Sequence, residues 1–415
     1  MALPDLDVIR DPLWDNIRLD RPAQLVLDTP AVQRLRYIRQ LGHAFLVYPG
    51  ATHTRFEHAL GAYHLTRRAL AALDERGALA GVTERECLGL RLAALLHDIG
   101  HYPFSHALEE AGFPSHEAQG AARLAEGELG RRLAEIGGGE LAAEVGRLIQ
   151  GRSVSPLQGL ISGSLDLDKI DYLSRDAHMC GVPYGTVDVD RLLSTLTIVE
   201  ADGGGRELGV HEKGVSALES LLFAKYQMYR NVYWHHAVRS ATCMFKRAAR
   251  VAVREGIVTQ GAIADLTDDA FMELLVSRSK SPLARAVRER RLFKRALDLP
   301  ASDVPGEGEA WVEDPARLEE VEDAVAAECG LAPGELLIDF PARPSMLAVD
   351  LPLVTRAGDI ERLTDAGRAG QLGLPRVADE LYRSARRLRV FVARPPARAP
   401  DMVLGLVSGS ARSGG

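Results

Sequence analysis

Histidine and aspartate recur along this chain in the order H…HD…D, and each occurrence falls on a stretch with helical character. His58 lies in HTRFEHALG, His97 and Asp98 lie in LAALLHDIGHYPFSH, and Asp168 lies in SLDLDKIDYLSRDAH. Neutral imidazoles combined with carboxylates suit a divalent ion of borderline to hard character, which can bind phosphate oxygen and polarise water. The pattern therefore predicts a fold in which three distant helices meet around one metal ion.

The density of histidine in one part of the chain supports this interpretation. A single histidine on a helix is more often a packed, hydrogen-bonded core residue than a metal ligand. Here seven of the twelve histidines lie between positions 53 and 116. Arg55 and His58 are three residues apart and share a helix face, so one can ligate a metal while the other meets a bound phosphate. His97 and Asp98 are adjacent and can converge on one ion only near a helix end, where we expect Gly100 to stop the helix.

The stretch from Leu165 to Ala177 divides into two faces when each residue is turned by about 100° along a helix. One face is apolar, and the other carries Asp168, Lys169, Tyr172 and Asp176. A solvated polar face is the simpler explanation of such a helix. In combination with the H…HD…D pattern, however, this face is expected to line a site, with Asp168 on the metal.

Four further side chains that can transfer or orient protons follow the HD pair closely, namely His101, His106, Glu109 and His116. A general acid for a phosphate leaving group needs a pKa near neutrality, and histidine is the usual choice. A carboxylate beside the histidine would orient its ring and raise its basicity. The sequence does not decide which of the four acts.

The stretch 225–239, KYQMYRNVYWHHAVR, interleaves aromatic and basic residues at helical spacing. Such a helix can stack on a base and meet phosphates. An aromatic-rich core helix explains the same pattern equally well.

The composition is that of an ordinary globular protein, with 46% hydrophobic and 26% charged residues among 415. The net charge of −7 argues against a general nucleic-acid binder, so any phosphate site must be a local cluster of cations. The four cysteines have no paired spacing, which argues against disulfides and a structural zinc site. The N-terminus does not resemble a signal peptide, and no apolar run is long enough to span a membrane. We therefore expect a cytoplasmic protein.

Helices are expected over several ranges, and residues 201–212 are expected to form a hairpin turn or loop. The expected helices are 29–41, 55–73, 83–100, 115–135, 140–151, 165–178, 188–196, 213–255 and 315–329. Thr83 and Glu86 form a capping-box pattern in front of one of them. PASDVPGEGEA resembles a linker, and GELLIDFPARP and RRLRVFVARPP resemble strands.

Several segments together resemble the HD-superfamily deoxynucleoside triphosphate triphosphohydrolases, mammalian and bacterial: DPLWDNIRLD, DTPAVQRLRYIRQLGHAFLVYPGATHTRFEHALG, LLHDIGHYPFSH, HEAQG and LDLDKIDYLSRDAHMCGV. The resemblance spans roughly residues 7–255, and a weaker likeness continues in LLIDFPARP and LRVFVARP. It implies a mainly α fold, with an HD-domain helical core over 1–300, a small α+β C-terminal lobe over 301–405 and a disordered tail over 406–415.

The resemblance also implies roles for individual residues. One divalent ion (Mg, Mn, Fe or Zn) would be held by His58, His97, Asp98 and Asp168. The catalytic residues would be His116, Glu109 as its acidic companion, and His106 near the α-phosphate. The substrate contacts would be Gln40, Leu41, Arg55, His101, Lys169, Tyr172, Asp176, Arg230, Tyr233 and His235. Gln40 and Asp176 would bind the sugar 3′-OH, and Asn231 stands where the family has a second arginine after Arg230.

Members of this family form homo-oligomers, and some are switched on by nucleotides at subunit interfaces. The resemblance implies a dimer or tetramer here, with Asp28, Gln33 and Arg36 at the positions of an activator site. Asp7 stands where the mammalian enzyme has a phosphate-binding lysine, and a carboxylate there would repel a triphosphate. We therefore expect regulation to differ from that of the mammalian enzyme.

The leading hypothesis is metal-dependent hydrolysis of a deoxynucleoside triphosphate to deoxynucleoside and tripolyphosphate. A second hypothesis keeps the metal but changes the substrate to a nucleoside monophosphate, a ribonucleotide or a cyclic dinucleotide. A third is a nucleotide sensor or nucleic-acid-binding oligomer with little turnover, which the complete ligand set and the negative charge disfavour.

Overall fold

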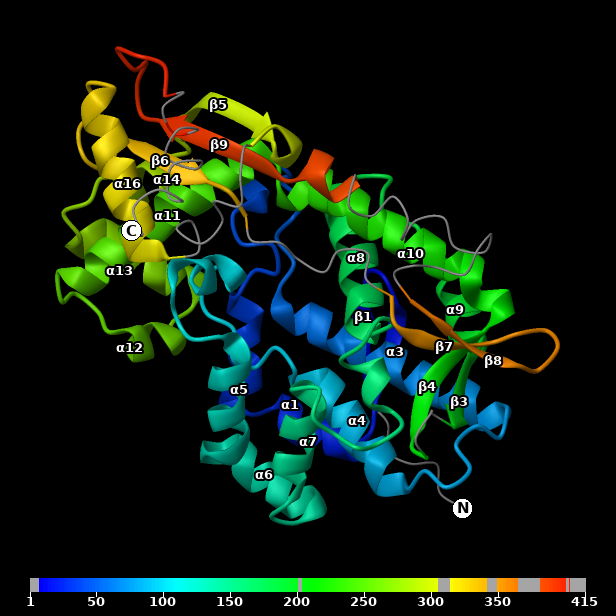
Figure 1. The fold of residues 1–415 in the computed structure, drawn as a ribbon. Helices are drawn as coiled ribbons and strands as arrows, with labels where there is room; N and C mark the ends of the chain where they lie inside the picture. Colours follow the sequence, from blue (N-terminus) through cyan, green and yellow to red (C-terminus); the bar gives the residue numbers. More distant parts are fainter. Residues whose placement is uncertain are drawn as a thin grey trace, which may run out of the picture.

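The computed structural model describes residues 7–200, 204–304, 314–341, 349–364, 381–400 and 403. Over these ranges the chain is mainly helical with small sheets, which confirms the predicted fold class (Figure 1). The tail predicted at 406–415 lies outside the described residues. No helix among the described residues combines the length and apolar character needed to cross a bilayer.

The α-helices are α1 (Arg21–Leu27), α2 (Pro30–Gln33), α3 (Arg55–Glu75), α4 (Glu84–Leu96), α5 (His116–Ala125), α6 (Gly127–Gly137), α7 (Leu141–Ile149), α8 (Leu167–Cys180), α9 (Val189–Ser194), α10 (Val215–Met228), α11 (His236–Arg254), α12 (Gln260–Ala264), α13 (Asp268–Arg278), α14 (Leu283–Arg288) and α16 (Pro315–Glu328). The short helical turns are η1 (Arg34–Tyr37), η2 (Ala44–Leu46), η3 (Ser105–Ala107), η4 (Glu109–Ala111), η5 (Gln158–Leu160), η6 (Glu212–Gly214), η7 (Tyr229–Tyr233, a π-helical turn) and η8 (Ala301–Asp303). The strands are β1 (Asp7–Asp11), β2 (Asp15–Leu19), β3 (Leu196–Glu200), β4 (Arg206–His211), β5 (Lys294–Pro300), β6 (Leu336–Asp339), β7 (Leu351–Val354), β8 (Ile360–Leu363) and β9 (Arg387–Val392).

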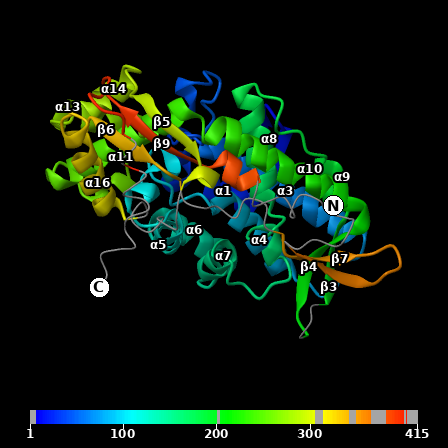
Figure 2. The same ribbon diagram turned by 45° about the horizontal axis from the view of Figure 1, so that its top comes forward.

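Helix α3 packs against both α4 and α8, and this packing forms the centre of the helical part (Figures 1 and 2). Local sequence sets where these helices begin and end. The capping box predicted at Thr83 and Glu86 is present at the start of α4. Asp166 caps α8 by accepting from the Lys169 backbone N–H at 2.9 Å. Gly181 ends α8 with a φ of +68°, a conformation that favours glycine.

The helix predicted over 29–41 is shorter than expected. Helix α2 ends at Gln33 and continues only as the 3₁₀ turn η1 to Tyr37, after which Ile38 is extended. The reason is tertiary, because the Gln40 backbone N–H donates to His53 O at 3.0 Å and the Arg55 N–H donates to Ile38 O at 2.9 Å. This pairing holds the strand-like segment beside the start of α3.

Two other predicted helices are each divided. The range 115–135 separates into α5 and α6 because Glu126 is extended and Gly127 has a φ of +65°. The range 213–255 separates into α10 and α11 around the π-helical turn η7. The ring Nδ1 of His235 accepts from the Ala237 N–H and starts α11. Turns of this kind often occur at functional sites.

Gly100 does not end α4, which stops before His97. Its role is to allow close packing, since a Cβ at Gly100 would lie 2.0 Å from His116 O and 2.4 Å from Gly120 N. The absence of a side chain at Gly100 therefore lets the start of α5 approach the HD pair.

Two small sheets lie toward opposite ends of the molecule (Figures 1 and 2). The sheet β5-β9-β6 is antiparallel and, with α16, carries its own apolar core, as the strand-like segments predicted. In the sheet β3-β4-β7-β8, β4 occupies Arg206–His211, within the range 201–212 where only a hairpin turn or loop was expected, because these residues pair antiparallel with β3 and parallel with β7. Strands from either side of position 300 thus pair within both sheets. The boundary between core and lobe at 300/301 stays a prediction.

A buried cation on α11 joins the β6 strand to the turn η4. Arg239, which is 6% exposed, donates to Asp339 Oδ1 at 2.7 Å and to Glu110 Oε2 at 2.8 Å. Asp339 is 1% exposed, so its charge has no access to water. Partial burial would raise the pKa of Glu110, but Arg239 and Lys246 outweigh it and hold that pKa below its usual range.

We predict that Arg239→Met lowers the free energy of unfolding at pH 7 by ~3–5 kcal/mol, because Asp339 is left buried without its cation. A carboxylate with a lowered pKa contributes stability above its unfolded-state value, near 4.5 for Glu110, and loses it as the pH falls. The difference in the free energy of unfolding between the variant and the wild type should therefore become smaller below that pH. Urea unfolding at several pH values measures both effects. Arg85→Met, at an exposed pair with Glu144, should change stability little at any pH.

Candidate metal centre and active site

Three helices bring the four predicted metal ligands together. His58 lies in the first turn of α3, His97 and Asp98 follow the last turn of α4, and Asp168 lies in the first turn of α8. His58 and Asp98 are buried, whereas the Asp168 side chain keeps 30% exposure. A ligand can therefore reach this metal cluster (His58, His97, Asp98 and Asp168) from the side of Asp168.

The donor atoms of the metal cluster face one another. The Nε2 atoms of His58 and His97 lie 3.1 Å apart. Asp168 Oδ1 lies 2.8 Å from His58 Nε2 and 3.3 Å from His97 Nε2. Asp98 has its oxygens 3.7 Å from His58 Nε2 and 3.4 Å from His97 Nε2. Separations near 3 Å are those of neighbouring ligands on an ion with bonds of about 2.1 Å.

The Nδ1 atoms of His58 and His97, which face away from the metal cluster, also indicate a metal site. His58 Nδ1 faces Asp171 Oδ2 at 2.8 Å, and His97 Nδ1 faces the carbonyl oxygen of Ala94 at 2.9 Å. Each acceptor accepts a hydrogen bond from Nδ1–H, which leaves the Nε2 lone pair of each ring directed toward the metal cluster. Burial would lower the pKa of His58, but the hydrogen bonds that its ring donates to Asp168 and Asp171 outweigh it and raise the pKa to about 10. The position thus favours a cation, and the donor set fits a divalent ion.

Arg55 contacts the metal cluster directly. Its Nη1 donates to Asp98 Oδ2 at 2.5 Å, and its Nε donates to Ser105 Oγ at 3.0 Å. Ser105 and the preceding Phe104 both have left-handed backbones, with φ of 57° and 59°, which is uncommon outside glycine. Asp268 accepts from the Phe104 N–H at 2.8 Å and holds this turn. The strained turn therefore places a hydroxyl group against Arg55.

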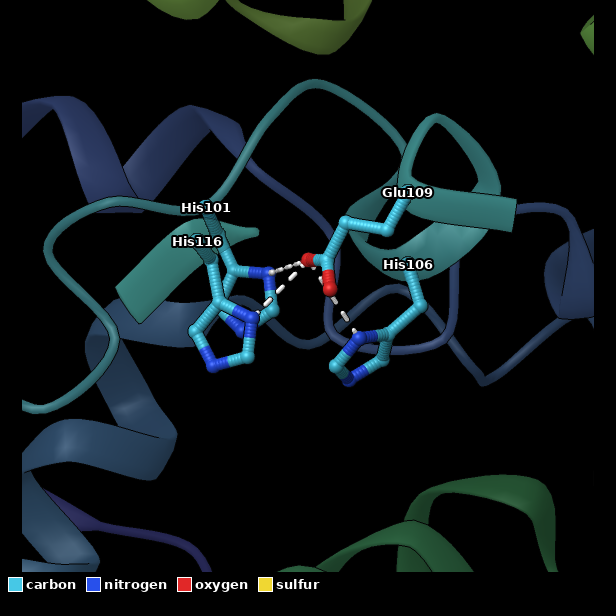
Figure 3. Close-up of side chains that lie close together, drawn as sticks. All are labelled: His101, His106, Glu109 and His116. Atoms are coloured by element: carbon cyan, nitrogen blue, oxygen red, sulfur yellow. Dashed lines mark hydrogen bonds and ion pairs between the residues drawn. The ribbon is translucent and has the colours of Figure 1, made fainter. Parts of the chain in front are cut away.

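A second cluster, the histidine–glutamate cluster, consists of His101, His106, Glu109 and His116 (Figure 3). Glu109 Oε1 lies 2.9 Å from His116 Nδ1, 3.5 Å from His106 Nδ1 and 3.9 Å from His101 Nδ1. Burial would raise the pKa of Glu109, but its hydrogen bonds with His106 and His116 outweigh it and hold that pKa well below the usual range. Glu109 is therefore ionised at neutral pH and orients the rings around it.

His101 lies between the two clusters. Its Nε2 is 3.0 Å from Asp98 Oδ1, and its ring stacks on that of His116 with centroids 3.9 Å apart. Three residues of the metal cluster, His58, His97 and Asp168, and all four residues of the histidine–glutamate cluster have donor atoms close enough together to hold a metal ion. Because the His101 and His116 rings are nearly parallel, at 11°, their lone pairs run side by side and do not meet at one point. The metal cluster therefore fits an ion better.

Of the predicted sugar contacts, Asp176 lies on α8 two turns after Asp168, whereas Gln40 lies in the extended segment after η1. Asp176 is buried and bonds to His53 Nε2 at 2.7 Å and to the Tyr233 hydroxyl at 2.7 Å. The rings of Tyr172 and Tyr233 lie in edge contact. Gln40 is 8% exposed, and its Oε1 has no hydrogen-bond partner in the structure. A buried acceptor of this kind favours a ligand that donates a hydrogen bond.

Other predicted substrate residues make different contacts. Lys169 Nζ donates to Asp166 Oδ2 and to Gly163 O. Leu41 is partly buried against the core. Arg230 is exposed and donates to the Tyr226 hydroxyl at 2.7 Å. His235 starts α11 and contacts Tyr48 and His236. None of these four side chains hydrogen-bonds to the metal cluster.

Sequence reasoning missed several residues at the site. Asp171 and Arg175 follow Asp168 at helical spacing, and their DxxDxxxR pattern was a usable signal. His53 precedes His58 in the same motif, but its contact with Asp176 joins residues 123 positions apart. Lys225 was not missed, because it begins the 225–239 stretch expected to meet phosphates; it is buried in α10, where burial and Lys169 lower its pKa to about 8. It adds a cation near the start of α8.

Two family patterns match the chain. The HD domain matches residues 55–176, and the HD associated region matches residues 187–369. The first pattern contains all four residues of the metal cluster.

Relatives with similar sequences are known from archaea, bacteria and vertebrates. An uncharacterized protein of Methanocaldococcus jannaschii is 36% identical, over 70% of this chain and 60% of its own length. Deoxynucleoside triphosphate triphosphohydrolase SAMHD1 of Homo sapiens is 28% identical, over 70% of this chain and 54% of its own length. The chain thus spans little more than half the length of these relatives. The crystal structure of a phosphohydrolase from Bacteroides thetaiotaomicron matches with a TM-score of 0.71 and 24% identity, covering 94% of this chain and 100% of that one, and it shows the same fold.

We predict that the purified protein binds one divalent ion and that His97→Ala and Asp168→Ala lose it, because each removes a donor atom from the metal cluster. His106→Ala should keep the ion, since His106 faces Glu109. The test is the metal content of each variant, measured by mass spectrometry after dialysis has removed the unbound metal. Loss of the ion in His106→Ala, with retention in His97→Ala, would move the site to the histidine–glutamate cluster.

Proposed function

This chain is a member of the HD-domain family, and on that premise we propose that it hydrolyses deoxynucleoside triphosphates to deoxynucleoside and tripolyphosphate. The observation that carries the proposal is the contact between the two clusters. His101 reaches Asp98 on one side and stacks on His116 on the other. A metal-bound phosphate would therefore lie next to an imidazole oriented for proton transfer. The name of the human relative, at 28% identity, supports the choice of a deoxynucleoside triphosphate.

His58, His97, Asp98 and Asp168 would hold the ion. When bound there, a divalent ion binds phosphate oxygen and polarises water. Arg55, fixed by Asp98 and Ser105, adds positive charge beside the α-phosphate. His58, Asp98 and Arg55 are buried, so their charges act at a lower dielectric than they would in water.

His116 would act as the general acid. Glu109 accepts a hydrogen bond from Nδ1–H, so the Nε2–H of a protonated ring is available to the substrate. Water adds to the α-phosphorus, the bond to the 5′-oxygen breaks, and His116 gives its proton to that oxygen. The proton released by the water restores His116, so the balance is one water consumed for each triphosphate cleaved.

The sugar would lie between Gln40 and the aromatic residues of α8 and η7. The unpartnered Gln40 Oε1 can accept a hydrogen bond from the 3′-OH. Asp176 is already bonded to His53 and Tyr233 and would accept from the same hydroxyl while it holds the Tyr233 ring in place. This arrangement supports a nucleoside with a free 3′-OH.

Homo-oligomerisation, a nucleotide activator and a cytoplasmic location are part of the same proposal and rest on the family resemblance. Gln33 and Arg36, at the expected activator positions, are hydrogen-bonded to each other at 2.8 Å.

We predict that the metal-loaded protein converts dNTPs to deoxynucleoside and tripolyphosphate. The protein is stripped of metal with a chelator and reloaded with Mg, Mn, Fe or Zn. It is then incubated with each dNTP, its matched ribonucleotide, nucleoside monophosphates and cyclic dinucleotides. Phosphorus NMR identifies the product. In oxygen-18 water the label should enter tripolyphosphate and not the nucleoside, because the attack is at phosphorus. Release of pyrophosphate or monophosphate would contradict the proposed bond, and turnover of another ester alone would favour the alternative substrate.

We predict that His116→Gln lowers kcat by about 100- to 10,000-fold, the usual contribution of a general acid. Glu109→Gln should lower kcat less, because it keeps the shape but loses the charge that orients His116. Both variants should retain the ion. His178→Gln, at an exposed position on α8, is the matched control and should behave as wild type. Wild-type turnover in His116→Gln would exclude this residue as the acid.

A further inference from the structure

We propose that the N-terminal hairpin β1–β2 is part of the metal centre, with Asp11 and Trp14 acting through Asp171 and Arg175 as positioning residues for His58. The inference rests on the metal site of the proposed function and goes beyond it, because the hairpin lies outside the HD domain at residues 55–176. The ion affinity would then depend on a segment that the domain pattern does not include.

The first link is the bond between Asp171 and His58. Asp171 is 0% exposed, and its Oδ2 lies 2.8 Å from His58 Nδ1. A carboxylate in this position fixes both the tautomer and the rotation of the imidazole, and so the direction of its Nε2 lone pair. Asp171 therefore controls one of the four donors without touching the ion.

The second link is Arg175, one turn further along α8. Its Nε and Nη2 donate to the two Asp171 oxygens at 2.9 and 3.0 Å. Its Nη1 and Nη2 donate to the two Asp11 oxygens at 2.8 and 3.3 Å. Arg175 is 1% exposed and Asp11 3%. The guanidinium thus holds two buried carboxylates in fixed planes, one from the metal centre and one from the hairpin.

The third link is the hairpin turn itself. Asp11 Oδ1 accepts from the backbone N–H groups of Leu13 and Trp14 at 2.9 and 2.8 Å, which shapes the turn between β1 and β2. The Trp14 indole N–H donates to Asp171 Oδ1. Asp171 therefore has His58 and Arg175 on one oxygen, and Trp14 and Arg175 on the other. No oxygen of this carboxylate is left free to rotate away.

Gly61 shows how closely the network is packed against α3. It lies three residues after His58, and a Cβ there would lie 1.8 Å from Asp171 Oδ1 and 2.5 Å from Arg175 Nη2. The space beside His58 is thus reserved for the carboxylate and the guanidinium. Space kept free for two charged groups beside a metal ligand is expected where those groups position the ligand. A helix that only filled the core would not need it.

The test compares metal affinity with stability. Trp14→Phe keeps the aromatic ring and removes one N–H, and Arg175→Gln removes both ion pairs. Each should raise the dissociation constant for Zn²⁺ or Mn²⁺ by about 10- to 100-fold, the usual effect of losing a hydrogen bond that orients a metal ligand. Competition with a chelator measures this constant. Arg247→Gln is the matched control, because Arg247 is a buried arginine paired with Glu322 and Asp323 and does not touch the metal centre. It should lower Tm without changing the dissociation constant.

A spectroscopic readout separates positioning from general stability. The indole N–H resonance that disappears in Trp14→Phe should shift when Zn²⁺ is titrated into the wild-type protein. Unchanged affinity in Trp14→Phe and Arg175→Gln, with an unmoved indole resonance, would overturn the inference while leaving the proposed function intact. Weakened affinity with no dNTP turnover in the wild type would leave the inference and overturn the function. A wild-type protein that binds no divalent ion would overturn both.

Discussion

The packing of α3 against α4 and α8 is the constraint on which the rest of the structure depends. Each helix supplies only part of the donor set. His58 must face inward from the first turn of α3, where Arg55 reaches the carboxylate at the end of α4. Asp168 must approach from the start of α8, so that its carboxylate lies beside the imidazoles of His58 and His97. A rotation of one helix by a single residue, about 100°, would remove its ligand from the centre.

Burying so many charges is possible because each carboxylate has a partner on a different element. Asp98 has Arg55, Asp171 has Arg175 and His58, and Asp176 has His53 and Tyr233. Such pairs offset desolvation only when their geometry is good and their remaining hydrogen-bonding groups are satisfied. The same condition makes the site rigid, which is what proton transfer and phosphate binding require.

The helical phases and the caps could be predicted because they depend on neighbours within four residues. The Thr83–Glu86 box and the apolar face of the 165–177 stretch are examples. The positions where the predicted helices are interrupted could not be predicted. Gln40 leaves its predicted helix because it pairs with His53, and α10 ends in a π-helical turn that carries Tyr233 to Asp176. The partners lie 13 and 57 residues away, so no local pattern contains them.

The residue types and their order along the chain determined that imidazoles and carboxylates would meet on helices, because helix periodicity and charge are local properties. Tertiary structure alone decided their partners. It brought Trp14 to Asp171 across 157 positions, His53 to Asp176 across 123, and Asp11 to Arg175 across 164. The physical reason is that the distance between groups far apart in sequence depends on how the helices pack, and packing depends on the shape of the whole core.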